Sequence, residues 1–342
     1  MIITAKAIIF ALIVSILHAV DGQGEKSESP QIKTHNLSGP YLGQVPPGDT
    51  PQLFAPGIVS TGKHEHSAPA FTPDGREVFW SVHTPPFGRG IPPVIMHMKI
   101  SNGKWVGPFK ASFSGEHGDD SPILAPDGKT LYFGSKRPTT PGGKAKKKFD
   151  LWKVSKQGEQ WGKPVHMGGV LESASHDFAA SQTTSGVIYF LRGDGSKDDP
   201  FTILFTKNEK GRYTKPVKLP APINTDTDSP SWTPYIAPDE SFLLFSSTRP
   251  GGYGSLDLYV CFRRGDGSWG KAYNLGPKIN TKSPERFPAI SPDGKRIFFV
   301  SKRMKKELEK KDVPQNGFSD IYWVGAGIIQ ELKQKHEARA PY

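Results

Sequence analysis

The sequence predicts an all-β fold, a five-bladed β-propeller built from four-stranded antiparallel blades. Three observations predict it: a tight-turn unit occurs five times, the spacing of these units is nearly constant, and each is followed by further strand-like segments. The turns centre on Asp74, Asp127, Thr184, Asp239 and Asp293, at spacings of 53, 57, 55 and 54 residues. Self-similarity at a fixed period of this length indicates a repeat architecture in which each unit forms one blade.

The turn unit is most complete in residues 283–303, SPERFPAISPDGKRIFFVSKR. An apolar strand at 288–290 leads into the turn at 291–294, and a second strand follows at 296–300. Because Pro presets φ near −65° and Gly accepts a positive φ, Pro-Asp-Gly between apolar runs predicts a tight turn. The other copies are FTPDGREVFWS, LAPDGKTLYFGS, SQTTSGVIYFL and IAPDESFLLFSS. The third copy lacks Pro-Asp-Gly, and the fourth lacks its Gly.

Two more strands complete each repeat. The third is of the Asp-Leu-Tyr type at 150–152, 257–259 and 320–322, with weaker versions at 94–96 and 202–204. The fourth follows a Gly-x-Trp-Gly kind of turn, as in WGKPVHMGGVL and WGKAYNLGPKIN. Four antiparallel strands in about 50 residues are typical of a propeller blade.

The last repeat lacks a fourth strand, because Gly-Ala-Gly and a helical-looking tail follow residue 324. At the other end of the chain, TPQLFAPGIVSTG resembles the fourth strands of the other repeats. We therefore expect residues of about 50–62 to close the ring as the outer strand of the last blade. Closure of this kind removes free sheet edges.

The predicted organisation is a signal peptide at 1–23, a flexible linker at 24–50, the propeller at 51–325 and a C-terminal helical tail at 326–342. The apolar run from Ala7 to Val20 is too short to span a membrane comfortably but fits a secretory signal. We expect export to the periplasm or the exterior, and no membrane span after removal of the signal; retention of the segment as an anchor stays open. The 24–50 segment is Pro/Gly-rich without periodicity, which favours a linker or a stretch draped over the surface.

The protein is basic, with 44 Lys and Arg against 33 Asp and Glu and a net charge of +11. The basic runs at 144–148 and 302–311 carry no interleaved aromatic residues, so we do not expect nucleic acid as a partner. Cys261 is the only cysteine, which excludes an intramolecular disulfide and predicts a buried core thiol within the apolar run 258–262. We expect a monomer.

Candidate site residues emerge when the repeats are aligned on their turns. Counting back eight and seven positions reaches the entry of the innermost strand of each blade, which should ring the mouth of the central channel. The predicted ligand-binding residues there are His66, Asp119, Asp120, His176, Asp177, Glu285 and Arg286. Imidazoles and carboxylates are ligands for divalent metals and groups for acid/base chemistry, so a metal site of His66, His176 and Asp119 is expected. The alternative is that these groups only hydrogen-bond the backbone around a solvated channel.

A second repeated pattern joins arginine and aspartate. Asp150, Asp257 and Asp320 each precede an aromatic third strand, and we expect them to accept hydrogen bonds from neighbouring loops. Arginines at equivalent insertion starts are the expected partners, because guanidinium and carboxylate groups pair in a bidentate way. These arginines are Arg137, Arg249 and Arg303.

The Ser-Pro-Asp-Gly-Lys turn at 291–295, the aromatic strand after it, the Ser-Thr-Arg-Pro-Gly-Gly segment at 247–252 and the Asp-Leu-Tyr strand resemble TolB-like (WD-type) β-propeller repeats of exported proteins, over residues 51–325. The resemblance implies a propeller of the cell envelope, and such propellers serve as binding platforms, enzymes or parts of larger assemblies. We expect a binding or scaffold protein that recognises a protein segment or glycan at the channel mouth. The alternatives are a metal-assisted carbohydrate hydrolase or lyase that uses the same ring, and a purely structural module.

Overall fold

The computed structural model describes residues 37–85, 91–225 and 229–338, which lie within one compact unit, residues 33–342. The predicted signal peptide and the predicted linker up to residue 36 lie outside the described residues. Five antiparallel sheets follow one another along the described chain, and a two-stranded hairpin accompanies the third. This confirms the predicted all-β, five-bladed β-propeller.

The first three blades account for residues 64–218. Blade 1 consists of β2 (His64–Glu65), β3 (Ala70–Phe71), β4 (Glu77–His83), β5 (Val94–Ser101) and β6 (Lys104–Lys110). Blade 2 consists of β7 (Asp119–Leu124), β8 (Thr130–Ser135), β9 (Asp150–Gln157), β10 (Gln160–Trp161) and β11 (Val165–His166). Blade 3 consists of β12 (His176–Gln182), β13 (Ile188–Gly193), β14 (Thr202–Thr206) and β17 (Val217–Lys218), beside the hairpin β15 (Asn208–Glu209) and β16 (Arg212–Tyr213). In the first two blades one strand position is divided between two short strands, β2 with β3 and β10 with β11, so four positions remain.

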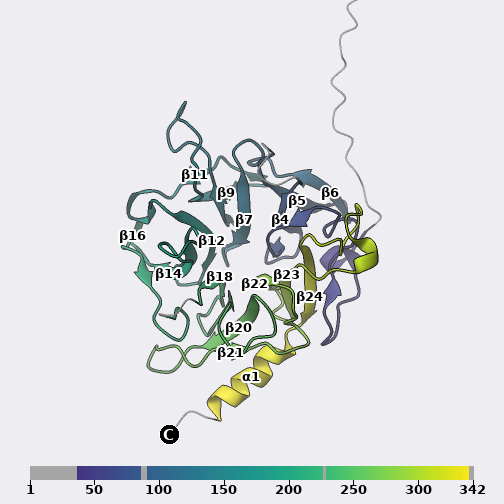
Figure 1. Cartoon of the computed structure of the whole chain (residues 1–342). Helices are drawn as coiled ribbons and strands as arrows, with labels where there is room; N and C mark the ends of the chain where they lie inside the picture. The colour runs from purple at the N-terminus through teal and green to yellow at the C-terminus, as the bar shows by residue number, and fades with distance from the viewer. Residues whose placement is uncertain (1–36, 86–90, 226–228, 339–342) are drawn as a thin grey trace, which may run out of the picture. The chain divides into compact units, whose positions relative to one another are not determined.

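The last two blades complete the ring. Blade 4 consists of β18 (Ser231–Ile236), β19 (Phe242–Ser247), β20 (Asp257–Phe262) and β21 (Tyr273–Asn274). Blade 5 consists of β22 (Glu285–Ile290), β23 (Arg296–Ser301), β24 (Asp320–Gly325) and β1 (Gln52–Leu53). Because Gln52 pairs with Trp323 and Leu53 with Tyr322, the predicted closure by an N-terminal strand is confirmed. Figure 1 shows the blades around a common centre, with β7, β12, β18 and β22 nearest to it.

Aromatic side chains of the second strands fill the space between blades. One from each blade is at most 1% exposed: Trp80, Phe133, Phe190, Phe245 and Phe299. Burial of a large aromatic side chain stabilises the fold by up to about 3 kcal/mol, which offsets the absence of disulfides. The Cys261 thiol is fully buried, as predicted.

Residues 37–50, in the second half of the predicted linker, pack onto the propeller. They contain the 3₁₀-helix η1 (Pro40–Gly43), whose Leu42 is 1% exposed. The Tyr41 ring contacts Phe71 of blade 1 and Trp323 of blade 5, with centroids 5.5 and 5.6 Å apart. This part of the segment therefore lies on the surface across the closing blade, the second of the two arrangements expected for it.

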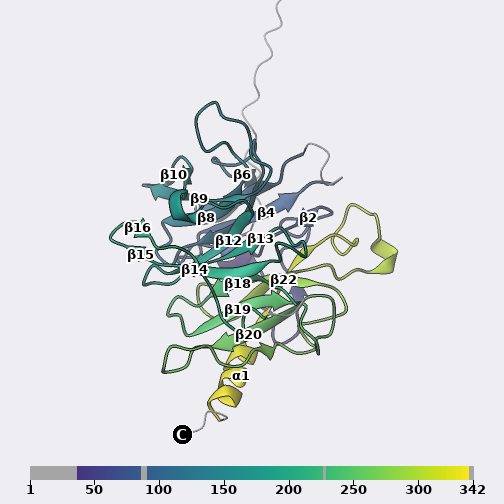
Figure 2. The ribbon, with the colours of Figure 1, turned by 60° about the vertical axis from the view of Figure 1, so that its left-hand side comes forward.

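The C-terminal helix α1 (Gly327–Glu337) follows β24 directly. It buries Leu332, and its His336 ring lies 5.6 Å from the Phe262 ring of β20. Figure 2 shows the helix beside β20. Short 3₁₀-helices at η2 (Gly169–Leu171) and η3 (Lys306–Leu308) lie in connections between strands. Among the described residues, no helix has the length and apolar character needed to cross a membrane.

Candidate functional site

Each innermost strand is interrupted at the same place, and this break defines the end of the channel. Blades 2 to 5 carry a β-bulge there, with a non-glycine residue at a φ between 45° and 53°: Ser121, Ala179, Thr233 and Phe287. In blade 1 the gap between β2 and β3 takes this place. The residue immediately before the break is therefore equivalent in all blades. We call these five residues the channel ring: His66, Asp120, Phe178, Trp232 and Arg286.

Three interactions connect His66, Asp120 and Arg286 of the channel ring with one another. The His66 ring contacts Phe287 of blade 5, with centroids 4.9 Å apart, and its Nδ1 lies 2.9 Å from Oδ2 of Asp120 in blade 2. The Asp120 carboxylate also acts electrostatically on Arg286, although blades 2 and 5 are not neighbours in the ring. Three of the seven predicted ligand-binding residues thus belong to the ring.

The carboxylates of Asp119, Asp177 and Glu285 come one residue before the channel ring and are bound within their own blades. Arg137 Nη2 lies 2.7 Å from Asp119 Oδ1, and Arg192 Nε lies 2.6 Å from Asp177 Oδ1. Glu285 accepts hydrogen bonds from Ser301 Oγ and Thr281 Oγ1, at 2.8 and 2.7 Å. Burial raises the pKa of Asp177 to about 6, although Arg192 opposes the shift. These three groups anchor loops to first strands.

The expected pairing of Arg137, Arg249 and Arg303 with the third-strand aspartates is wrong. Arg137 pairs with Asp119 and Arg303 with Glu285, while Arg249 donates to the carbonyls of Pro222 and Ile223. The aspartates lie at the same end of the blade but face the loops that connect the second strand to the third. Asp257 accepts from the Tyr253 and Gly254 amides, Asp320 from the Gln315 amide, and Asp150 pairs with Lys146. Acceptance of hydrogen bonds from neighbouring loops is therefore confirmed for Asp257 and Asp320, with partners other than arginine, whereas Asp150 forms an ion pair.

His176 lies apart from the other predicted metal ligands. Its Nδ1 accepts the Phe149 amide at 3.1 Å, and its ring packs 5.5 Å from the Phe149 ring. Burial and the nearby Lys148 and Lys136 lower the pKa of His176, so the ring is neutral at pH 7. It ties the connection between β8 and β9 of blade 2 to the start of β12 in blade 3. Among the described residues, the predicted set of His66, His176 and Asp119 does not converge on one point.

A different group of three does converge, and we call it the His-Asp cluster: His66, His83 and Asp120. His66 Nδ1 and His83 Nε2 lie 2.9 and 3.1 Å from the same oxygen, Oδ2 of Asp120. One ligand atom from each residue lies within 4.8 Å of the other two. His83 had not been predicted, because it ends the second strand of blade 1 and is brought in by its pairing with His64.

The charges of the His-Asp cluster follow from burial and proximity. Burial alone would raise the pKa of Asp120, but His66 and His83 hold it well below its ordinary value, so the carboxylate is ionised. Burial lowers the pKa of His66 in spite of Asp120, and the ring is neutral at pH 7. Burial, with positive charge around it, also lowers the pKa of His64 to about 2. This end of the channel therefore contains the Asp120 anion beside the neutral rings of His64 and His66.

Arg286 brings the opposite charge to the channel ring. Its guanidinium lies over the Phe287 ring at 5.8 Å and has no hydrogen bond or ion pair with another described residue. Burial lowers its pKa, and Asp120 opposes the shift. Burial and then the positive charge of Arg286 lower the pKa of Lys302. A half-buried guanidinium without an internal partner can bind an anionic group.

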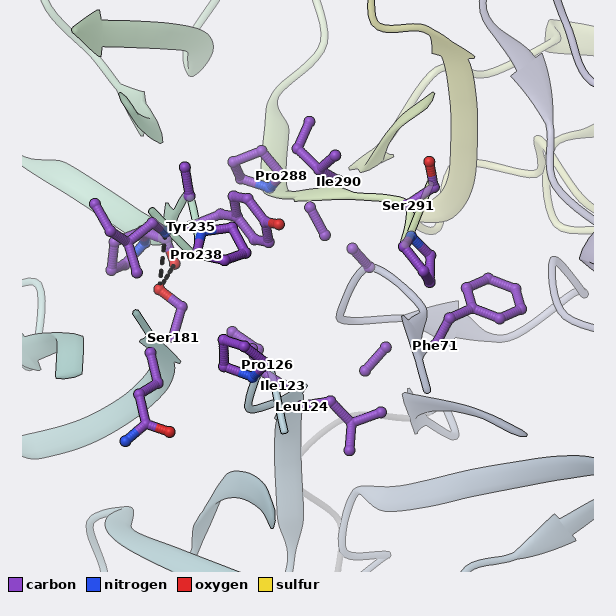
Figure 3. A pocket seen from close by; sticks show the side chains of 18 of the residues that line it. Phe71, Ile123, Leu124, Pro126, Ser181, Tyr235, Pro238, Pro288, Ile290 and Ser291 are labelled. Carbon is purple, nitrogen blue, oxygen red and sulfur yellow. Dashed lines mark hydrogen bonds between the residues drawn. The ribbon is translucent and has the colours of Figure 1, made fainter. Parts of the chain in front are cut away.

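Beyond the channel ring, the channel continues as a cavity of about 710 Å³. Its wall is made of the bulge residues and of apolar side chains from the innermost strands, among them Ile123, Tyr235, Pro288 and Ile290. Figure 3 shows Ile123, Leu124 and Pro126 on one side of this opening, with Tyr235, Pro288 and Ile290 across it. The channel therefore combines a charged end with an apolar chamber.

No protein-family model and no curated protein sequence matches the chain. Among solved structures, the chain is similar to a protein assigned to TolB from Agrobacterium tumefaciens, with a TM-score of 0.45 and 17% identity over 76% of this chain and 89% of that one. A puromycin-hydrolysing peptidase of Mycobacterium tuberculosis gives a TM-score of 0.38 and 15% identity over 69% of this chain and 34% of that one. Prolyl oligopeptidase B from Galerina marginata gives a TM-score of 0.40 and 13% identity over 70% of this chain and 31% of that one. The chain spans about a third of these two peptidases, and its strand pairing, not these likenesses, establishes the propeller.

Proposed function

We propose that the protein is an exported, monomeric binding protein that binds a carboxylate-bearing protein segment or glycan at the channel ring. The location is periplasmic or secreted, in keeping with the apolar run from Ala7 to Val20. The observation that carries the binding proposal is Arg286, half-buried at the centre of the propeller and without a partner among the described residues.

The chemistry of the site favours a carboxylate. Guanidinium binds carboxylates with two parallel hydrogen bonds, and the interaction gains strength where water is excluded. A half-buried charge without a partner costs free energy that a bound anion recovers. The adjoining chamber of about 710 Å³ has the volume of a small-ligand pocket, and its apolar wall suits a side chain or the face of a sugar ring.

Calorimetric titration of the full chain with two probes tests the proposal: a short peptide rich in glutamate, and an oligosaccharide of uronic acid units. We expect one of the two to bind, and Arg286→Met to weaken it by about 10- to 100-fold, since hydrogen bonds to charged groups contribute about 1.5–3 kcal/mol. Arg76→Met is the matched control, because Arg76 is an exposed arginine in the first turn. Equal binding by Arg286→Met and wild type, or no binding of either probe at millimolar concentration, would overturn the proposal.

The His-Asp cluster favours a second candidate, a metal-assisted hydrolase or lyase acting on carbohydrate. Two imidazoles and a carboxylate beside a channel are a ligand set that leaves a metal position open for a reacting group. This candidate predicts new reducing ends or unsaturated products after the oligosaccharide is incubated with metal-loaded protein. A binding protein leaves the same oligosaccharide intact.

A further inference from the structure

We propose that the His-Asp cluster is a metal site that holds one divalent transition-metal ion, with zinc preferred over magnesium and calcium. The ligands are His66 Nδ1, His83 Nε2 and Asp120 Oδ2. The inference goes beyond the proposed binding function, since binding of a carboxylate by Arg286 needs no metal, and the second candidate function depends on it. It also replaces the ligand set expected from the sequence, in which His176 and Asp119 stood in place of His83 and Asp120.

The distances fit an ion. The two imidazole nitrogens lie 2.9 and 3.1 Å from the carboxylate oxygen, and the three atoms all lie within 4.8 Å of one another. Ligand atoms at about 2.0–2.1 Å from a tetrahedral ion are themselves about 3.3 Å apart. Small side-chain shifts that bring the three atoms to this spacing would therefore admit zinc between them.

The donor set selects among metals. Two imidazoles and one carboxylate suit zinc and similar transition metals, whereas calcium takes six to eight oxygen ligands and magnesium keeps near-octahedral oxygen coordination. Three protein ligands leave a fourth position for water or a bound group. The His66 and His83 side chains are 18% and 22% exposed, so solvent reaches the cluster.

Asp120 is held by a second layer of contacts that directs one oxygen at the imidazoles. Its side chain is 1% exposed, and its Oδ1 accepts hydrogen bonds from Ser81 Oγ at 2.6 Å and from the Ser121 amide at 2.7 Å. The Ser121 amide is available because the bulge puts this residue at a φ of 53°. The other oxygen, Oδ2, interacts with His66 and His83. Supporting contacts of this kind orient the ligands of metal sites.

A metal-free arrangement is the competing explanation, in which both imidazoles donate N–H to Asp120. The two explanations differ in stoichiometric metal binding and in its dependence on His83. They also differ in the effect of Asp120→Asn, which keeps an acceptor for imidazole N–H but removes an anionic metal ligand. No ligand other than the metal enters this comparison, so its outcome is independent of the carboxylate proposal.

The experiment titrates full-length, chelator-stripped protein without a polyhistidine tag with Zn²⁺ and, as a spectroscopic probe, with Co²⁺. We expect one ion per chain, and a visible Co²⁺ band whose intensity marks four-coordination. His83→Ala and Asp120→Asn should each weaken Zn²⁺ binding by more than the roughly 10- to 100-fold that outer-layer substitutions cost. His176→Ala is the matched control and should bind Zn²⁺ as wild type does, because His176 lies outside the cluster.

Two safeguards keep the result decisive. Far-UV circular dichroism and thermal melting check that each variant folds, and His83→Gln provides a second variant that retains polarity and size should His83→Ala unfold. Binding of less than one Zn²⁺ per chain at micromolar concentration would overturn the proposal. So would wild-type affinity in folded His83→Ala or His83→Gln, or an equal loss in His176→Ala.

Discussion

Arg137 and Asp119, 18 residues apart in the chain, form a buried ion pair within blade 2. Arg137 Nη2 lies 2.7 Å from Asp119 Oδ1, and the same oxygen accepts Ser135 Oγ at 2.6 Å. The guanidinium also lies over the rings of Phe133 and Trp152, each 5.2 Å away. The arginine after the second strand thereby ties its loop to the first strand, and Arg303 with Glu285 repeats the arrangement in blade 5.

Removal of the Asp119 carboxylate should destabilise the fold strongly. The Asp119 side chain is 0% exposed and that of Arg137 11%, so Asp119→Ala leaves a desolvated guanidinium without its counter-charge. Loss of one partner of a buried pair costs about 3–5 kcal/mol. Urea unfolding followed by circular dichroism measures this loss.

Glu116→Ala is the control for this measurement, since Glu116 is nearby and its side chain is 89% exposed. It should change the free energy of unfolding by no more than about 0.5 kcal/mol. A loss of less than about 1 kcal/mol in Asp119→Ala would show that the pair is hydrated in solution and does not anchor the loop.

Closure of the ring depends on Phe54, the residue after β1. Its side chain is fully buried, with ring centroids 5.1 Å from Phe298 and 5.3 Å from Trp323, and its amide donates to the Ile321 carbonyl at 2.8 Å. Phe54→Ala should lower the free energy of unfolding by about 3–5 kcal/mol, because it leaves a cavity at the seam between blades 5 and 1. Chemical denaturation measures the loss. Val45→Ala, at an 85% exposed position, is the control, and equal stability of the two variants would contradict a closing role.

The sequence was sufficient for the blade count and the closing strand because both follow from repeated, locally encoded units. A Pro-Asp-Gly turn and an aromatic strand form from short-range preferences, and the missing fourth strand leaves one edge that the N-terminal segment can pair with. Even the third repeat, in which Ser185 takes the place of the usual Asp, has the expected strands on both sides of the turn.

The register at the channel could not be read in the same way. The distance from the first-strand carboxylate to the turn is nine residues in blade 1, from Glu65 to Asp74, eight in blade 2 and seven in blade 3, from Asp177 to Thr184. Alignment on the turn therefore set His176 level with His66, although the strand pairing sets it level with His64. In blade 3 the shift comes from the turn, because the Gly186 amide donates to Thr183 as the Gly128 amide donates to Ala125, so Ser185 and not Thr184 is equivalent to Asp127. In blade 1 the stretch from Glu65 to Asp74 is one residue longer than the stretch from Asp119 to Asp127 in blade 2.

His83 shows a second reason why the site could not be predicted from the sequence alone. Its partners come from a neighbouring strand and a neighbouring blade, so its place in the cluster depends on the pairing of β2 with β4 and on the contact between blades 1 and 2. The sequence contained one usable signal. The His-Glu-His segment at 64–66 precedes a strand, β4, that itself ends in a histidine, His83. That signal becomes specific only once the antiparallel register is known.

Asp320 should make the protein less stable as the pH rises through neutrality. Burial raises its pKa from the ordinary 3.8 to about 7, and the hydrogen bond from the Gln315 amide only partly opposes the shift. The pKa of the nearby Glu65 is also raised well above its ordinary value, by burial first and also by Asp320. Because the folded state then holds its proton more tightly than the unfolded state, the contribution of Asp320 to stability is complete below about pH 4 and is lost as the pH rises through about 7.

Asp320→Asn tests this dependence, because the amide keeps an oxygen for the Gln315 N–H and cannot ionise. We expect the wild-type Tm to fall from pH 5 to pH 8 at constant ionic strength, and the fall to be clearly smaller in Asp320→Asn, which becomes the more stable protein at pH 8. Asp266→Asn, at an exposed turn position, should follow the wild-type profile. Parallel Tm profiles for wild type and Asp320→Asn would mean that Asp320 is already ionised in the folded protein, with a cation or water reaching its buried carboxylate.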